Sequence, residues 1–419
     1  MVIERARNRL WRQVAFCGVV LACVIGWLTL LSRPDRPLQP LALKANTRDS
    51  ERPTYSPDIR VNLTATPREN VRLSVDGPFD VRPVGTTEVA GFGKQLRACT
   101  VSATKSGIRV DDTVYPMTRL EIIPDKSPAI WIEGRQYRGR VRFFRKSGGK
   151  IIAVNVLPMN DYIASVINGE MPLVFGRAAR QAQAVVARTY ALAQMNRKHP
   201  QYDVFASSRS QKYIGHKYRD SKGRLLAGDD RTSREVARET AGMICTYKGK
   251  IFTTYYSAVC GGQTALGTTV FPDAAPPLQS VPCRYCQSAK RFQWTVKLSR
   301  NEVSRRLGTH LKKQGAVEGL RRISPKRGEV PSFEALISGR KQTISGATLR
   351  RVLSTTKLPS PYFNVRVEGN FFIFEGRGHG HTVGLCQWGA HGQAQSGRTC
   401  LEILQYYYPG SDIVILEDM

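Results

Sequence analysis

Residues 150–172 read KIIAVNVLPMNDYIASVINGEMP, and within this stretch the chain changes from strand to helix. The apolar run 151–154 is typical of a buried strand. Pro158 suits the first turn of a helix, where a backbone N–H is not needed. Beyond it, apolar side chains recur on one helical face at Ile163, Val166 and Ile167. The stretch therefore predicts a strand that leads into an amphipathic helix.

The chain differs on the two sides of this point. Residues 60–156 show short alternating strands and turns, and Gly148-Gly149 is a hairpin signal. Residues 157–415 mix strands with helices, including one over 178–197 and two that begin with capping boxes at Ser299 and Thr399. Because strands and helices are grouped rather than alternating, we expect an α+β fold with a β-rich first part and a mixed second part.

Charge narrows the possible partners. The 419 residues hold 63 Lys+Arg against 33 Asp+Glu, a net charge of +30, and 41% of residues are hydrophobic. Aromatic residues make up 9% of the chain, which argues against a disordered chain. Such a basic surface attracts polyanions, so nucleic acid, anionic lipid and anionic cell-wall polymer are all candidates.

The amino terminus favours one of these partners. Four arginines within residues 5–12 precede an uncharged apolar run at 14–31. We expect residues 1–32 to form a cytoplasmic tip and a single transmembrane helix, followed by a Pro-rich linker at 33–59. A cleaved signal peptide is the alternative. The rest of the chain would then lie outside the cytoplasm, which favours cell wall over nucleic acid.

A basic stretch interrupts the second part of the chain. Residues 290–351 contain 16 Lys+Arg and 4 Glu. The simpler interpretation is an insertion with a solvated face, and the sharper one is a surface for an anionic polymer. No aromatic residue interleaves with the basic doublets, which argues against nucleic acid stacked on aromatic rings.

Glu170 is the strongest candidate for catalysis. It ends the expected amphipathic helix, three and four residues after Ile167 and Val166, which directs it toward apolar packing. Burial raises the pKa of a carboxyl group, and a general acid at neutral pH needs a raised pKa. On spacing alone, a surface glutamate at a helix end is the simpler interpretation.

Two further groups of residues could carry chemistry. The glycine-rich run 376–384 holds His379 and His381, and a generic turn is its simple alternative. Gln387 and Trp388 follow, and a sugar ring could lie on the indole. Four cysteines could bind a structural zinc ion or form disulfides, and both alternatives stay open: Cys260, Cys283, Cys286 and Cys386.

The order of several motifs resembles that of the stage II sporulation protein D family, also called the SpoIID/LytB or amidase-enhancer domain. The likeness covers roughly residues 60–415. The matching segments are 154–162, 169–172, 180–191, 210–215, 239–242, 255–256, 261–264, 376–381, 387–390 and 407–410.

The resemblance implies a membrane-anchored, extracytoplasmic lytic transglycosylase that cuts peptidoglycan glycan strands stripped of their stem peptides. Glu170, in Glu170-Met171-Pro172, matches the family's catalytic acid. The alternative is a wall-binding module that enhances a peptidoglycan amidase. No cofactor is required, and no nucleic acid is expected as a partner. The resemblance also suggests a set of glycan-binding residues: Arg188, Tyr190, Gln211, Tyr213, His381, Gln387 and Trp388.

The chain departs from the family around one metal site. Some members bind zinc through His and Cys residues near the Ser-Gln-x-Tyr motif, but residues 205–210 read FASSRS and offer no such ligand. Cys386 stands where the family usually has Ser. A zinc ion, if present, is therefore expected at the four cysteines above.

Overall fold

A computed structural model describes residues 56–416, except 313–314 and 324–327. The predicted membrane anchor and residues 33–55 of the predicted linker lie outside the described residues. Within the described ranges, none of the helices has both the length and the apolar character needed to cross a bilayer. The folded part begins slightly earlier than predicted, because Asp58 and Ile59 already belong to a strand that pairs with the strand before Glu170's helix.

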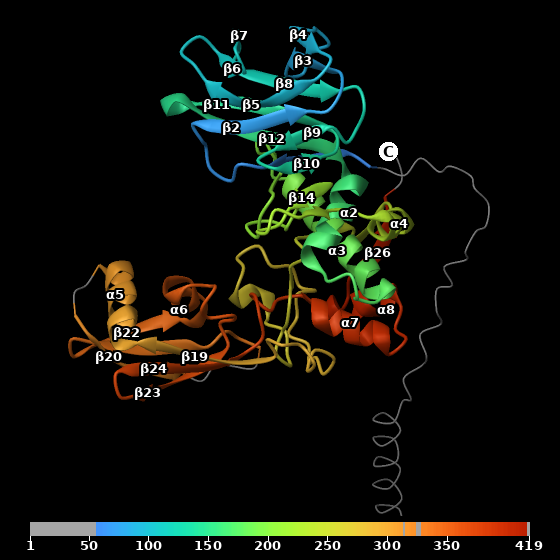
Figure 1. The fold of residues 1–419 in the computed structure, drawn as a ribbon. Helices are drawn as coiled ribbons and strands as arrows, with labels where there is room; N and C mark the ends of the chain where they lie inside the picture. The colour runs from blue at the N-terminus through green and yellow to red at the C-terminus, as the bar shows by residue number, and fades with distance from the viewer. Residues whose placement is uncertain (1–55, 313–314, 324–327, 417–419) are drawn as a thin grey trace, which may run out of the picture. The chain divides into compact units, whose positions relative to one another are not determined.

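Two large sheets form the β-rich part (Figure 1). In spatial order, the seven-stranded sheet comprises β13 (Val204–Phe205), β1 (Asp58–Asn62), β12 (Lys150–Pro158), β11 (Arg140–Lys146), β8 (Arg119–Pro124), β3 (Phe79–Pro83) and β4 (Gly91–Gly93). The eight-stranded sheet comprises β15 (Leu225–Ala227), β14 (Lys217–Arg219), β10 (Arg135–Tyr137), β9 (Ile130–Ile132), β2 (Asn70–Val75), β5 (Leu96–Ala103), β6 (Ile108–Val110) and β7 (Thr113–Tyr115). Buried side chains of both sheets share one core.

The predicted change from strand to helix is confirmed. The turn Ser147–Gly149 joins β11 to β12, and Gly148 and Gly149 both have positive φ, which glycine tolerates without strain. Every residue of β12 between its two ends is buried. Pro158 then precedes α2 (Met159–Glu170) directly, so the central strand of the sheet leads straight to Glu170.

A layer of helices and short strands follows. The helices are α2, α3 (Arg177–Met195), α4 (Arg231–Glu239), α7 (Gln387–Gln395) and α8 (Cys400–Tyr407). The strands are β16 (Met243–Tyr247), β17 (Lys250–Ile251), β26 (Asp412–Ile415), β18 (Tyr256–Ser257) and β25 (Leu385–Cys386). The predicted helix over 178–197 is α3, and the predicted capping box at Thr399 opens α8. Thirteen of the 19 residues of α3 are buried, because it packs against α2, α7, α8 and β16.

The basic stretch is part of a small folded unit with its own core. Its sheets are β19 (Gln293–Ser299), β24 (Phe371–Arg377) and β23 (Phe363–Glu368), and β20 (Val317–Ile323), β21 (Ser332–Ile337) and β22 (Arg340–Ser345). Its helices are α5 (Arg300–Leu311) and α6 (Gly346–Leu353). Ser299 caps α5, but the predicted capping box is only half formed, because the Glu302 carboxylate pairs with Lys357 and Arg306 instead. This unit extends beyond the predicted boundary at residue 351. β24 lies between β19 and β23 and completes their sheet (Figure 1). The described chain thus mixes helices and strands and is rich in strands.

Candidate active site

Glu170 is held at the carboxyl end of α2 by groups from two other segments. Its Oε1 accepts hydrogen bonds from the backbone N–H of Lys212 at 2.7 Å and from the hydroxyl of Tyr256 at 3.2 Å. The preceding residue, Gly169, allows this approach, since a Cβ there would lie 2.0 Å from the carbonyl oxygen of Lys212. The carboxyl group is therefore fixed in position, and Glu170 as a whole residue is half-buried.

Buried polar groups orient Tyr256 toward Glu170. The hydroxyl of Tyr256 accepts a hydrogen bond from Nε2 of Gln211 at 3.1 Å. Gln211 is fully buried, and its Oε1 accepts from the hydroxyl of Tyr162 at 2.9 Å. Because Gln211 occupies the acceptor side of the Tyr256 hydroxyl, that hydroxyl is left to donate to Glu170. The series Tyr162–Gln211–Tyr256–Glu170 thus sets the proton arrangement around the carboxyl group.

A third contact comes from the start of α7. The side chain of Gln387 lies close enough to the carboxyl group of Glu170 to lower its pKa. Nε2 of Gln387 also donates to Oε1 of Gln183 on α3 at 3.2 Å. β18 and β25 pair in parallel, with Tyr256 opposite Leu385. This pairing brings Tyr256 and Gln387, which are far apart in the sequence, to the same carboxyl group.

Burial raises the pKa of Glu170. Hydrogen bonds from Lys212 N–H, Tyr256 and Gln387, together with the Lys212 charge, lower the pKa and offset this effect only in part. A carboxyl group with a raised pKa keeps its proton closer to neutral pH, which suits a group that first donates a proton and then accepts one. The structure thus gives Glu170 the electrostatic character that its sequence context suggested.

For two residues, Arg188 and Tyr213, the predicted role in glycan binding is wrong because both are buried. Arg188 is 1% exposed, and its guanidinium donates to the backbone carbonyls of Met243 and Ala237. Tyr213 is 2% exposed and donates to Oδ1 of Asn155 at 2.7 Å. Both side chains make their hydrogen bonds inside the protein, so neither can line a glycan groove. Gln211 is buried as well and reaches Glu170 only through Tyr256.

Tyr190 and His381 lie around Tyr255, the neighbour of Tyr256. Tyr255 stacks on Phe271 with ring centres 3.6 Å apart, and the His381 ring meets both edge-on at 5.8 and 5.0 Å. Tyr190 contacts Tyr255 with ring centres 6.2 Å apart. Burial lowers the pKa of His381 to about 4, so its ring is neutral at physiological pH. His381 is therefore a packed neighbour of the Tyr255-Tyr256 segment.

Trp388 follows Gln387 on α7 and is partly exposed. Its ring packs edge-on against Phe175, with ring centres 5.1 Å apart, and near His391 at 6.1 Å. Since Gln387 contacts Glu170 directly, Trp388 lies next to the site in sequence with an indole that is not fully covered. It keeps its place as a candidate sugar platform.

Several residues that hold Glu170 in place could not be identified from the sequence. Tyr256, Lys212, Gln183 and Tyr162 all lie within or beside the motifs that matched the family, but their role depends on contacts between distant segments. Tyr256 is 86 residues from Glu170 along the chain. The only sequence signal for Tyr256 is that it belongs to Tyr255-Tyr256, one of the segments that match the family.

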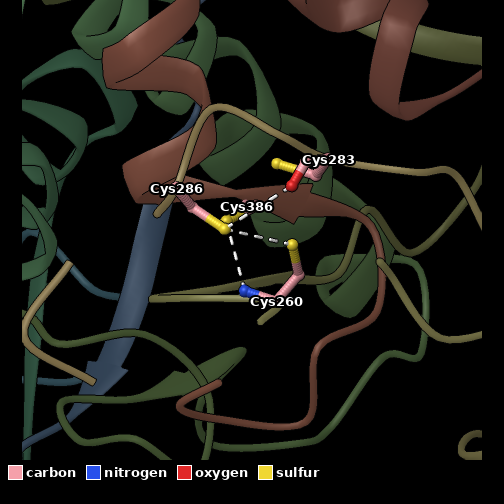
Figure 2. Close-up of side chains that lie close together, drawn as sticks. All are labelled: Cys260, Cys283, Cys286 and Cys386. Atoms are coloured by element: carbon pink, nitrogen blue, oxygen red, sulfur yellow. Dashed lines mark hydrogen bonds between the residues drawn. The ribbon is translucent and has the colours of Figure 1, made fainter. Parts of the chain in front are cut away.

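The four predicted cysteines come together in space (Figure 2). Their Sγ atoms all lie within 4.8 Å of one another, and all four residues are buried. The seven described cysteines are free thiols in this structure. A cavity of about 830 Å³ lies beside the cluster, lined in part by Cys260, Tyr362 and Arg377. None of these three residues contacts Glu170. The cavity therefore lies next to the cysteine cluster and is not formed by the groups that hold Glu170.

Comparison with known proteins places this chain in a family. A family model described as "Stage II sporulation protein" matches residues 147–247, which include Glu170 and Gln211. An uncharacterized protein of Brachyspira hyodysenteriae is 34% identical over 362 residues, 85% of this chain and 92% of that protein. Stage II sporulation protein D of Bacillus subtilis is 26% identical and covers 62% of this chain and 76% of its own length.

A further relative extends the match along most of the chain. The amidase enhancer of Bacillus subtilis is 24% identical over 89% of this chain, which spans 56% of that protein. The family model and the named relatives confirm the resemblance expected from the sequence. The chain belongs to the stage II sporulation protein D family, whose members have roles related to the cell wall.

Proposed function

We propose that the protein is a lytic transglycosylase that cleaves peptidoglycan glycan strands and leaves 1,6-anhydromuramyl ends. One observation carries this proposal: Glu170 is a half-buried residue whose carboxyl group has a raised pKa and is held by Lys212 N–H and Tyr256, with Gln387 close by. A pure binding module has no need of an acid held in this way.

The reaction needs only one protein acid. Protonated Glu170 donates its proton to the oxygen of the glycosidic bond as that bond breaks. The 6-hydroxyl of the same muramic acid then attacks the anomeric carbon, and the Glu170 carboxylate accepts the hydroxyl proton. The enzyme is regenerated with its proton, and no water is consumed.

The surroundings of Glu170 support this reaction over hydrolysis. A hydrolase needs a second carboxylate, either to activate water or to form a covalent intermediate. The charge of a nearby carboxylate would raise the pKa of Glu170, but among the described residues no carboxylate is a main cause of the rise, which comes from burial. The hydroxyl of Tyr256 can also stabilise the carboxylate form during the second half of the cycle.

The location of the protein is part of the proposal. The apolar run 14–31 would anchor it in the cell membrane with the folded part outside the cytoplasm, where peptidoglycan lies. The net charge of +30 would hold the folded part against an anionic wall. Glycan strands are the proposed substrate, and an amidase that removes stem peptides is the proposed supplier of that substrate.

The alternative function is a wall-binding module that stimulates an amidase without cleaving glycan. It is supported by the name of the Bacillus subtilis relative and by the long match to it. A binding module does not explain why Glu170 is held by hydrogen bonds and has a raised pKa, so this alternative ranks second.

An incubation of the purified chain with denuded glycan strands separates the two functions. We expect mass spectrometry to show fragments with anhydro ends, and Glu170→Gln to abolish them. Glu239→Gln is the matched control, because Glu239 ends α4 on the surface and pairs with Arg177. If the parent chain yields no fragments but increases the activity of an amidase, the binding function is correct.

A further inference from the structure

We infer that Cys260, Cys283, Cys286 and Cys386 bind one zinc ion that fixes the start of α7. Sγ of Cys260 and Sγ of Cys286 are 3.6 Å apart, and every pair among the four lies within 4.8 Å (Figure 2). A zinc ion with Zn–S bonds of about 2.3 Å places its four sulfurs about 3.8 Å apart in a tetrahedron. The four thiols are therefore already spaced for a tetrahedral ion.

The chain around the cluster is built for close approach. Gly261 and Gly262 follow Cys260 with φ of 76° and 109°, and a Cβ on Gly261 would lie 2.7 Å from the backbone nitrogen of Gly378. The carbonyl of Gly262 accepts a hydrogen bond from Cys283 N–H at 2.9 Å, which brings the C-x-x-C turn onto Cys260. Only glycine fits this fold-back without strain.

Hydrogen-bond donors point at the sulfurs. Sγ of Cys386 accepts from the backbone N–H of Cys260 at 3.2 Å and of Gly389 at 3.3 Å. Sγ of Cys283 lies 3.2 Å from the hydroxyl of Tyr407. Four thiolates around Zn²⁺ carry a net charge of −2, and N–H and O–H donors offset such charge in thiolate sites. Two disulfides would leave these donors without a thiolate acceptor.

The choice of metal follows from the ligands. All four donors are sulfur, which favours zinc over the oxygen-binding ions magnesium and calcium. Four protein ligands leave no open position for substrate or water, so the ion would be structural. It has a clear structural task, because β18 ends at Ser257, β19 begins at Gln293, and only a short turn of helix at Gly267–Thr269 lies between them.

The cluster is joined to the candidate active site through Cys386. Its Sγ caps the first turn of α7 by accepting from Gly389 N–H, and the next residue is Gln387, which contacts Glu170. Zinc binding would hold Cys386, and so would fix the position of Gln387. This link to activity rests on the proposed function, whereas zinc binding itself does not.

Elemental analysis of the full-length chain, purified without chelators, tests zinc binding directly. We expect one zinc per chain, and the cobalt-substituted protein should show the thiolate charge-transfer and tetrahedral absorption bands of a four-sulfur site. Cys286→Ser should reduce zinc content to about one-tenth or less. Cys99→Ser is the matched control, since Cys99 lies on β5 outside the cluster and should leave zinc unchanged.

Two outcomes would overturn the inference. One is a folded parent chain without zinc, whose four thiols resist alkylation until a reductant is added, which indicates disulfides. The other is a zinc content that Cys286→Ser leaves unchanged. If Cys286→Ser fails to fold, zinc release from the parent chain by a mercurial reagent gives the answer. A zinc-loaded chain that does not cleave glycan would contradict the proposed function alone.

Discussion

The hydroxyl of Tyr256 donates a 3.2 Å hydrogen bond to Oε1 of Glu170, across 86 residues of sequence. The same hydroxyl accepts a hydrogen bond from Gln211, which leaves its own proton directed at Glu170. This relationship ties the helix that ends at Glu170 to the β18–β25 pair that leads to Gln387. It makes the acid a property of the assembled fold rather than of one motif.

Tyr256→Phe tests this relationship. The hydrogen bond from Tyr256 lowers the pKa of Glu170, so its loss should raise that pKa further. We expect the alkaline limb of the pH–rate profile to move to higher pH and the maximal rate to fall about tenfold or more, as for a hydrogen bond to a charged group. Tyr247→Phe on β16 is the control. An unchanged profile in Tyr256→Phe would show that the hydroxyl does not act on Glu170.

Stability should depend on pH through Glu170. Its pKa is raised in the folded protein, so between its ordinary value and the raised one the folded chain binds more protons than the unfolded chain. The free energy of unfolding therefore falls as pH rises through this window. Denaturant unfolding from pH 4 to pH 8 should show a smaller fall for Glu170→Gln than for the parent. A steeper fall in the variant would contradict the raised pKa.

Arg188 is predicted to stabilise the fold and not to bind substrate. Arg188→Met leaves the carbonyls of Met243 and Ala237 without their donor. At about 1–3 kcal/mol for each buried unpaired group, the loss of stability should be about 2–6 kcal/mol. Urea unfolding measures it, with the exposed Arg231→Met as control. A variant of normal stability that binds glycan more weakly would restore Arg188 to the substrate site.

Gly169→Ala should damage the site although alanine favours helix. Alanine is usually better than glycine in a helix by about 1 kcal/mol. Here its Cβ would lie 2.0 Å from the carbonyl oxygen of Lys212 and would push away the N–H that holds Glu170. We expect lower stability and at least a tenfold loss of glycan cleavage, whereas Gly319→Ala, which has open space, should have little effect. Full activity in Gly169→Ala would mean that the Lys212 contact is dispensable.

The sequence was most informative where the structural signal is local. The passage from β12 to α2 follows from a change in periodicity and from Pro158, both visible within 23 residues of sequence, 150–172. The capping box at Thr399 is equally local. The four cysteines were grouped because few residue types can serve as zinc ligands.

Long-range pairing limited the rest of the prediction. β24 lies between β19 and β23, so the folded unit around the basic stretch extends beyond residue 351. Arg188 and Tyr213 were misassigned because a polar residue that satisfies buried backbone groups looks the same in sequence as one that binds a ligand. Tyr256 gains its role only when two distant strands pair.

Digestion of denuded glycan in heavy-oxygen water tests the central claim most directly. If Glu170 passes a proton while the muramic acid closes on itself, every new end on the muramic acid side will be an anhydro sugar, one water lighter than a hydrolysed end and free of solvent oxygen. Glu170→Gln should lower the yield by about 10²–10⁴-fold, the usual contribution of general acid–base catalysis. New ends that carry the heavy oxygen, or equal yields from the parent and Glu170→Gln, would contradict the account.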